Sequence, residues 1–153
     1  MTIRLAGAPI SWGVCEVEGW GHQLDPDRVL TEMRGAGLAA TELGPDGFLP
    51  SDPHELTNTL ARYDMTAVGG FVPVLLHDPD QDAVAAVGGA IDSLLASGSE
   101  VMVLAAVTGA VGYDSRPELD DSGWKTLLRN LDRVSSAAAD RGAPGGDPPP
   151  RGR

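Results

Sequence analysis

The stretch LAATELGP, residues 38–45, carries the first signal of the fold. It follows Gly37, which is typical of a helix end, and it finishes in Gly-Pro, which cannot continue a strand. An apolar run with one carboxylate, Glu42, at its far end indicates a buried parallel strand that delivers an acid to the edge of a sheet. Burying a carboxylate without a partner is costly, so its placement favours ligand binding, with an ion pair to a neighbouring loop as the alternative.

Length and charge limit the classes of protein to which the chain can belong. It has 153 residues, the length of one domain, and a net charge of −11. Strong negative charge repels phosphate groups, so we expect neither nucleic acid nor a membrane surface as a partner. There is no signal-peptide pattern and no apolar run long enough to span a membrane, which favours a cytoplasmic protein. The single cysteine, Cys15, excludes an internal disulfide and a thiolate metal cluster.

Strand and helix patterns alternate along the chain. Asp-Pro pairs at residues 25–26 and 52–53 each combine an N-cap with a proline at the first helical position, so they begin the first two helices. Apolar residues at helical spacing predict two further helices. We expect strands over residues 3–10, 38–45, 66–76 and 101–107, and helices over residues 25–37, 51–63, 81–96 and 123–139.

This alternation predicts a parallel sheet with helical crossovers. Two architectures share the pattern, the doubly wound open sheet and the (β/α)₈ barrel, and both bind ligands at the carboxyl ends of their strands. Four residues fall at that end and are candidates for ligand contact: Ser11, Trp12, Glu42 and His77. Neither a P-loop nor a dinucleotide-binding glycine pattern is present, which disfavours a nucleotide-binding open sheet.

Three short motifs carry a family resemblance. The segments APISW at residues 8–12, TELG at 41–44 and VGGF at 68–71 resemble the inosose dehydratase branch of the xylose-isomerase-like superfamily of sugar isomerases and epimerases. The resemblance covers residues 3–142. It implies an incomplete TIM barrel, with about four βα units of a (β/α)₈ barrel in residues 1–142.

The resemblance also implies a chemistry. A complete enzyme of this kind would bind a polyol ketone, remove a proton next to the carbonyl and expel a β-hydroxyl as water, while an isomerase or epimerase would return the proton elsewhere. Mn²⁺ or Co²⁺ is expected for the full-length family, with ligands on later strands that this chain lacks. This half would supply substrate contacts from Ser11, Trp12 as an apolar wall, Glu42 and His77. No catalytic residue is assigned.

Simpler roles remain open for two of these residues. Trp12 is also explained as an aromatic side chain that anchors a loop. His77, followed by Asp78-Pro79, is also explained as part of the cap of the third helix. A hydrolase pair of Ser11 and His77 is disfavoured because no nucleophile elbow is present. A different class of function, a non-catalytic half-barrel that self-associates, is the alternative to the enzyme.

The last eleven residues, 143–153, change abruptly to APGGDPPPRGR. Such a segment cannot bury apolar surface, so it predicts a disordered tail. We expect that a shift of reading frame near the Gly142 codon truncated a longer barrel, with a natural flexible tail as the alternative. We expect little or no turnover, because the metal ligands implied by the resemblance lie on strands that this chain does not contain. Four parallel strands also leave two open edges. We therefore predict a homo-oligomer, a dimer that completes a barrel-like core, with an aggregation-prone product as the alternative.

Overall fold

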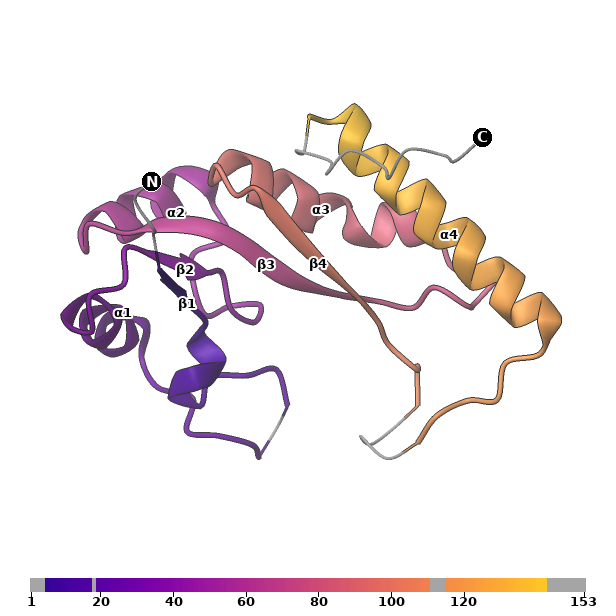
Figure 1. The fold of residues 1–153 in the computed structure, drawn as a ribbon, viewed down its shortest axis with the longest axis horizontal. Helices are drawn as coiled ribbons and strands as arrows, with labels where there is room; N and C mark the ends of the chain where they lie inside the picture. Colours follow the sequence, from indigo (N-terminus) through magenta and orange to yellow (C-terminus); the bar gives the residue numbers. More distant parts are fainter. Residues whose placement is uncertain (1–4, 18, 111–114, 143–153) are drawn as a thin grey trace. The chain divides into compact units, whose positions relative to one another are not determined.

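The computed structural model describes residues 5–17, 19–110 and 115–142 (Figure 1). The predicted tail, residues 143–153, lies outside the described residues. Strands and helices alternate as the sequence predicts. The elements are β1 (Ala6–Gly7), the 3₁₀ helix η1 (Pro9–Trp12), α1 (Pro26–Gly35), β2 (Ala40–Glu42), α2 (Pro53–Ala61), β3 (Thr66–Val74), α3 (Ala83–Ala96), β4 (Val101–Ala106) and α4 (Asp121–Asp140).

The strands form one sheet in the order β1-β2-β3-β4. β1 and β2 are parallel, and so are β2 and β3, with Ala40 beside both Ala6 and Thr66. β4 joins β3 where the backbone N–H of Glu100 donates to the Val68 carbonyl at 3.2 Å. A doubly wound sheet reverses its strand order at a switch point, whereas a barrel keeps sequential neighbours side by side. The observed order therefore favours the barrel of the two predicted architectures.

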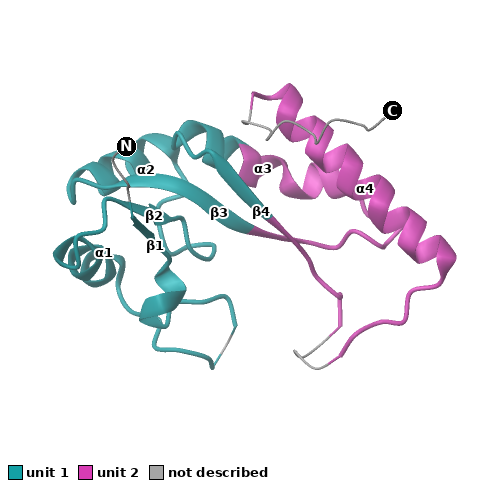
Figure 2. Ribbon diagram, in the orientation of Figure 1, with its two compact units in different colours: residues 1–71, 92–103 teal, residues 72–91, 104–153 magenta. Residues whose placement is uncertain are grey.

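Contacts divide the chain into two compact units (Figure 2). Unit 1 comprises residues 1–71 and 92–103, and unit 2 comprises residues 72–91 and 104–153. The division passes through β3, α3 and β4. None of the helices among the described residues has the length and apolar character needed to cross a membrane.

The core of unit 1 lies between the sheet and its first two helices. Asp25 caps α1 by accepting from the Asp27 N–H at 2.9 Å, and Asp52 caps α2 in the same way, as the Asp-Pro pairs predict. Each helix then turns an apolar stripe inward. The buried cluster consists of Val14, Val29, Leu30, Met33, Phe48, Leu49, Leu56, Leu60, Met65 and Ala67.

The first two strands are shorter than predicted. Residues 9–12 form a 3₁₀ turn instead of the end of a strand, because Pro9 has no N–H to donate to a ladder and Gly13 ends the turn at φ +80°. The predicted residues 3 and 4 lie outside the described part of the chain. β2 ends at Glu42, since Gly44 has φ +76° and Pro45 cannot continue the ladder.

β3 contains the irregularity that its glycines predict. Glu42 pairs with Gly69 while Thr41 pairs with Ala67, so one extra residue is inserted into β3 at this point. A Cβ on Gly69 would lie 2.4 Å from the Val101 carbonyl oxygen. Only glycine therefore lets the β4 backbone approach β3 this closely.

The apolar stripe predicted for the last helix is only partly buried. Val134 and Ala138 are buried in unit 2, but Trp124, Leu128 and Leu131 of α4 remain 53%, 59% and 37% exposed. Unit 2 therefore leaves the Trp124 side chain unburied. The reason is geometric. Successive residues of a helix are rotated by about 100°, and the face of α4 that unit 2 buries is centred beside the face that carries Trp124, Leu128 and Leu131. That face buries the polar Thr126 and Asn130 as well.

Candidate functional site

Glu42 lies at the carboxyl end of β2, where the sequence predicts an acid. The preceding residue, Thr41, is completely buried, and its hydroxyl donates to the Glu42 carbonyl at 2.8 Å. The Glu42 side chain itself is partly exposed. The ion pairs among the described residues are Arg28–Glu32, Arg34–Asp64 and Arg133–Asp82, so none of them holds Glu42. The described residues therefore do not support the alternative of a structural ion pair for Glu42.

The PISW and TELG motifs meet in unit 1. A Cβ on Gly44 would lie 3.0 Å from Cγ of Pro9 and 2.9 Å from Cδ1 of Phe48, so the turn after Glu42 rests directly on the ring of Pro9. Ser11 follows on the same 3₁₀ turn, which is closed by its own N–H donating to the Ala8 carbonyl at 3.0 Å. Ser11 is exposed. The ends of β1 and β2 thus place a hydroxyl and a carboxylate in neighbouring segments.

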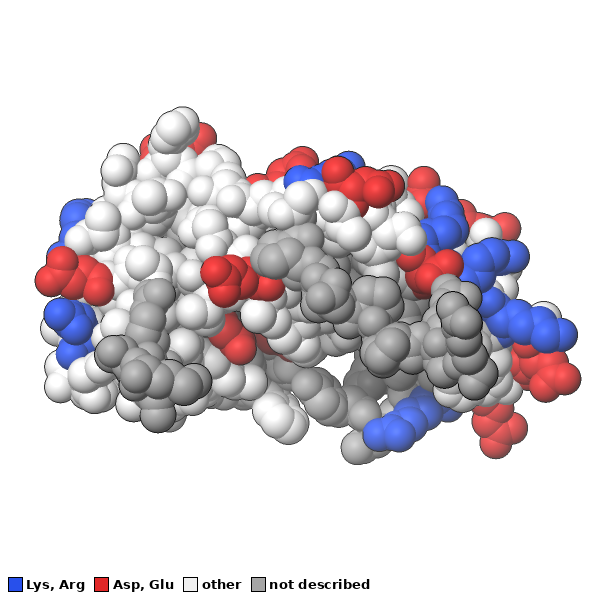
Figure 3. Space-filling view, turned by 45° about the horizontal axis from the view of Figure 1, so that its top comes forward, with Lys and Arg blue, Asp and Glu red and all other residues white. Residues whose placement is uncertain are grey.

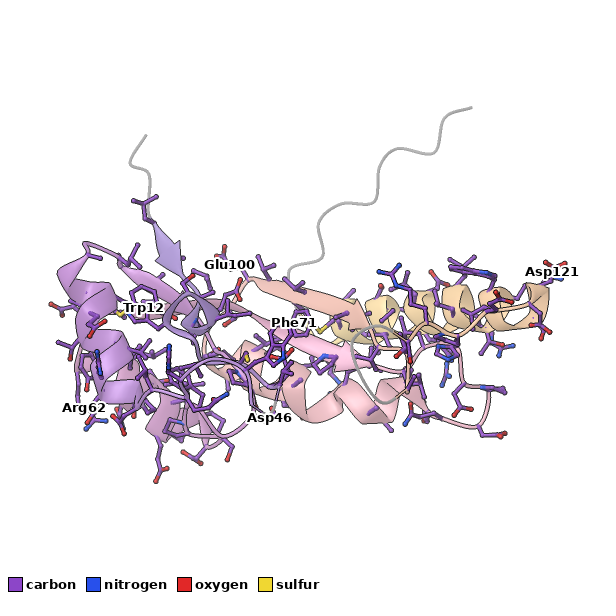
Figure 4. All side chains as sticks on the ribbon, turned by 90° about the horizontal axis from the view of Figure 1, so that it is seen from below. Trp12, Asp46, Arg62, Phe71, Glu100 and Asp121 are labelled. Carbon is purple, nitrogen blue, oxygen red and sulfur yellow. The ribbon has the colours of Figure 1, made fainter. Side chains whose placement is uncertain are left out.

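Trp12 is tied to α1 (Figure 4). Its indole Nε1 donates to Oε2 of Glu32 at 2.9 Å, and Nε of Arg28 donates to Oε1 of the same carboxylate at 3.0 Å. The hydrogen bonds from Arg28 and Trp12 lower the pKa of Glu32. The half-buried ring also packs against the core of unit 1. This geometry supports the loop-anchoring role and leaves only the ring surface for a ligand.

The loop after Trp12 is closed by two glycines. The Gly13 carbonyl accepts from the His22 N–H at 3.0 Å. A Cβ on Gly21 would lie within 1.9 Å of that same carbonyl oxygen, so no side chain fits there. The described part of this long loop therefore returns to its starting point. It carries the partly exposed Cys15 and the exposed His22.

His77 belongs to unit 2, in the segment between β3 and α3. It is partly exposed, and its place is fixed by its neighbour, because the Leu76 carbonyl accepts from Nδ2 of Asn130 at 2.9 Å. The cap of α3 comes from Asp82, whose Oδ1 accepts from the Val84 N–H at 3.2 Å. The capping alternative for His77 is therefore not supported.

Asn130 is the residue that sequence reasoning missed. It is 3% exposed, and its Oδ1 accepts from Nη1 of Arg133 at 3.2 Å, while Nη2 of Arg133 pairs with Asp82 at 3.1 Å. These bonds fasten both ends of the segment that carries His77 to α4. An amide among the apolar residues of a helix is the signal that could have identified it.

A metal does not fit the described residues. Nowhere in residues 5–17, 19–110 and 115–142 do three His, Cys, Asp or Glu side chains come close enough together to hold one. Within unit 1 the structure gathers Ser11, Trp12 and Glu42 at the carboxyl ends of β1 and β2. His77 is placed within unit 2. The described residues thus place polar side chains at strand ends and offer no ligand set for a metal.

Known proteins resemble this chain over nearly its whole length. It is 31% identical to inosose dehydratase from Lacticaseibacillus casei over 150 residues, which is 93% of this chain and 50% of that protein. It is 28% identical to inosose dehydratase from Geobacillus kaustophilus over 149 residues, 91% of this chain and 48% of that protein. No protein-family model matches the chain. The chain spans about half the length of the curated relatives it matches.

Two solved structures share the fold. The AP endonuclease of family 2 from Brucella melitensis has a TM-score of 0.63 at 16% identity, over 91% of this chain and 52% of that one. D-allulose 3-epimerase from Methylomonas sp. has a TM-score of 0.56 at 18% identity, over 92% of this chain and 49% of that one. The predicted fold, an incomplete (β/α)₈ barrel with four βα units, is confirmed. The chain corresponds to the N-terminal half of an inosose dehydratase-like protein.

Proposed function

We propose that this chain, a relative of the inosose dehydratases, binds a cyclitol or sugar ketone at the carboxyl ends of its strands. The observation that carries the proposal is the Glu42 carboxylate, partly exposed at the end of β2 and outside every ion pair of the described residues. Ionised carboxylates form strong hydrogen bonds with hydroxyl groups. A polyol offers several such hydroxyls, and the exposed Ser11 adds a donor and acceptor beside the same turn.

The reaction class follows from the relatives. In a dehydration of this type a base takes the proton next to the carbonyl, a C=C bond forms as the C–O bond to the β-hydroxyl breaks, and an acid gives a proton to that hydroxyl, which leaves as water. An isomerase or epimerase shares the first step and returns the proton to another position. Glu42 of unit 1 holds the substrate in this proposal, and Trp12 contributes only its ring surface.

Metal dependence is part of the proposal for the full-length family. Mn²⁺ or Co²⁺ would stabilise negative charge on the substrate oxygen. Since the described residues contain no suitable ligand group, the ligands would come from strands that the relatives have beyond the aligned half. The chain by itself should then bind substrate weakly and turn it over slowly or not at all.

Calorimetric titration with an inosose and with a ketohexose tests the proposal. We expect binding that weakens about tenfold in Glu42→Gln, because a charged acceptor becomes neutral. Glu100→Gln is the matched control, since Glu100 is exposed and directly precedes β4, at the start of a strand instead of its end. Equal affinity in both variants, or no binding by the wild type, would contradict the proposal. Turnover by the chain alone with added Mn²⁺ would contradict the assignment of the metal ligands to other strands.

A further inference from the structure

We propose that the outer edge of β4, with the apolar sheet face beside it, docks a second copy of this chain. The surface is formed by Phe71, Val101 and Val103, which are 47%, 55% and 44% exposed and all belong to unit 1. We call it the β4 surface. The inference does not depend on the proposed function. Figure 4 shows Phe71, its member on β3.

The three side chains share one face of the sheet. A Cβ on Gly69 would lie 3.1 Å from Cβ of Val101, so these two positions point to the same side. Phe71 lies two residues after Gly69, and Val103 two residues after Val101, so both repeat that direction. The three apolar side chains therefore form one exposed patch.

A bare apolar face is unusual for a parallel sheet, which is normally covered on both sides. The other side of β3 is covered in unit 1, because a Cβ on Gly70 would lie 3.3 Å from Cδ2 of Leu94 in α3. On the opposite side, the described residues leave the Phe71 side chain exposed. The β4 surface thus lacks the second layer that such a sheet needs.

The occupant follows from the two open edges. In the part of the chain that the structure describes, β1 and β4 occupy the outer positions of the sheet, so each leaves one side of its backbone without a neighbouring strand. In a head-to-tail pair, β4 of one copy lies beside β1 of the other, and a two-fold axis makes both joints equivalent. Eight strands then close with no free edge.

Length supports a second copy as the occupant. The chain covers 50% of the L. casei protein and 52% of the B. melitensis structure, so two copies together have about the length of one relative. Charge opposes association, since each copy carries −11. The β4 surface itself is uncharged, and in Figure 3 uncharged surface predominates over unit 1 in the view shown. Salt should therefore strengthen the dimer by screening the long-range repulsion.

Sedimentation velocity at high micromolar concentration, in low and in high salt, tests this inference. We expect a dimer with twice the mass of the 15.8 kDa chain, and its share of the protein should rise with the salt concentration. Val103→Glu should shift it to monomer, and should leave the single chain folded because Val103 is already exposed there. Ala61→Glu, which adds the same charge at an exposed position on α2, should leave the dimer intact.

Two results would overturn the inference: a monomeric wild type in high salt, or a dimer that survives Val103→Glu. Disruption of that surviving dimer by Leu128→Glu would move the contact to α4. If circular dichroism shows that Val103→Glu is unfolded, Val101→Thr replaces it. This nearly isosteric change should raise the dimer dissociation constant about tenfold. An unchanged dissociation constant in a folded Val101→Thr variant would also overturn the inference.

Discussion

The side-chain amide of Asn130 donates a hydrogen bond of 2.9 Å to the backbone carbonyl of Leu76, 54 residues earlier in the chain. Asn130 is buried in unit 2, so this hydrogen bond satisfies a polar side chain that water does not reach. It joins the middle of α4 to the residue that precedes His77. A candidate site residue on a short connecting segment thereby acquires a fixed backbone position.

Removing this amide should destabilise the chain. In Asn130→Ala the Leu76 carbonyl loses its partner in a buried environment, and Arg133 loses an acceptor. We expect the free energy of unfolding to fall by about 1–3 kcal/mol. Urea denaturation measures it, and Ser136→Ala, on the exposed side of the same helix, is the control. A loss below that of the control would mean that the bond contributes nothing.

Gly44 should not accept a side chain, for two separable reasons. Its φ of +76° costs an L-residue roughly 1–2 kcal/mol. A Cβ would also press on Pro9 and Phe48. Gly47 has a similar φ of +81°, but no atom lies within 4 Å of the position that its Cβ would take, so Gly47→Ala isolates the conformational cost.

We expect Gly44→Ala to lower the thermal unfolding temperature more than Gly47→Ala does. The difference between the two variants measures the close contact of Gly44 with Pro9 and Phe48. Equal effects would show that Gly44 does not rest on these two side chains in solution.

The Trp12–Glu32–Arg28 network predicts an ordered series of pKa values. Its hydrogen bonds lower the pKa of Glu32 from 4.5, with Arg28 as the larger cause and Trp12 as the second. Nuclear magnetic resonance titration of the Glu32 carboxyl should therefore give the lowest pKa in the wild type, a higher one in Trp12→Phe and a higher one still in Arg28→Met.

The same shift sets a dependence of stability on pH. Because the folded pKa of Glu32 lies below the unfolded value, the network stabilises the fold above pH 4.5, and this contribution is lost as the pH falls through the folded pKa. The variants should lose less stability on acidification than the wild type. A parallel loss in all three proteins would show that the network is not formed.

Local chemistry made most of the fold predictable. Each Asp-Pro pair identifies the N-cap and the first residue of its helix, α1 or α2. The apolar runs of β3 and β4 identify these segments as strands without knowledge of their neighbours. The predicted end of β1 was wrong because the apolar residues at 9–12 fit a strand as well as the turn that they form. The sequence pattern also could not tell which side of α4 is buried. Apolar residues occur on a wider part of the helix surface than the part that unit 2 buries.

The candidate site likewise contains residues that the sequence could identify and residues that it could not. Glu42 was identifiable because a carboxylate after an apolar strand stands out in the sequence. The partners of Trp12 and Leu76 were not, because Glu32 and Asn130 lie 20 and 54 residues away and only the fold brings them together.

The close approach at Gly69 limits how this chain can change by mutation. A methyl group there would meet the Val101 carbonyl oxygen at 2.4 Å, and a backbone atom has no room to withdraw. The next residue, Gly70, faces the flexible end of Leu94 at 3.3 Å, so an alanine is tolerable there. Single base changes in two adjacent glycine codons should thus have unequal fates, with those at Gly69 lost by selection because they detach β4 from the sheet.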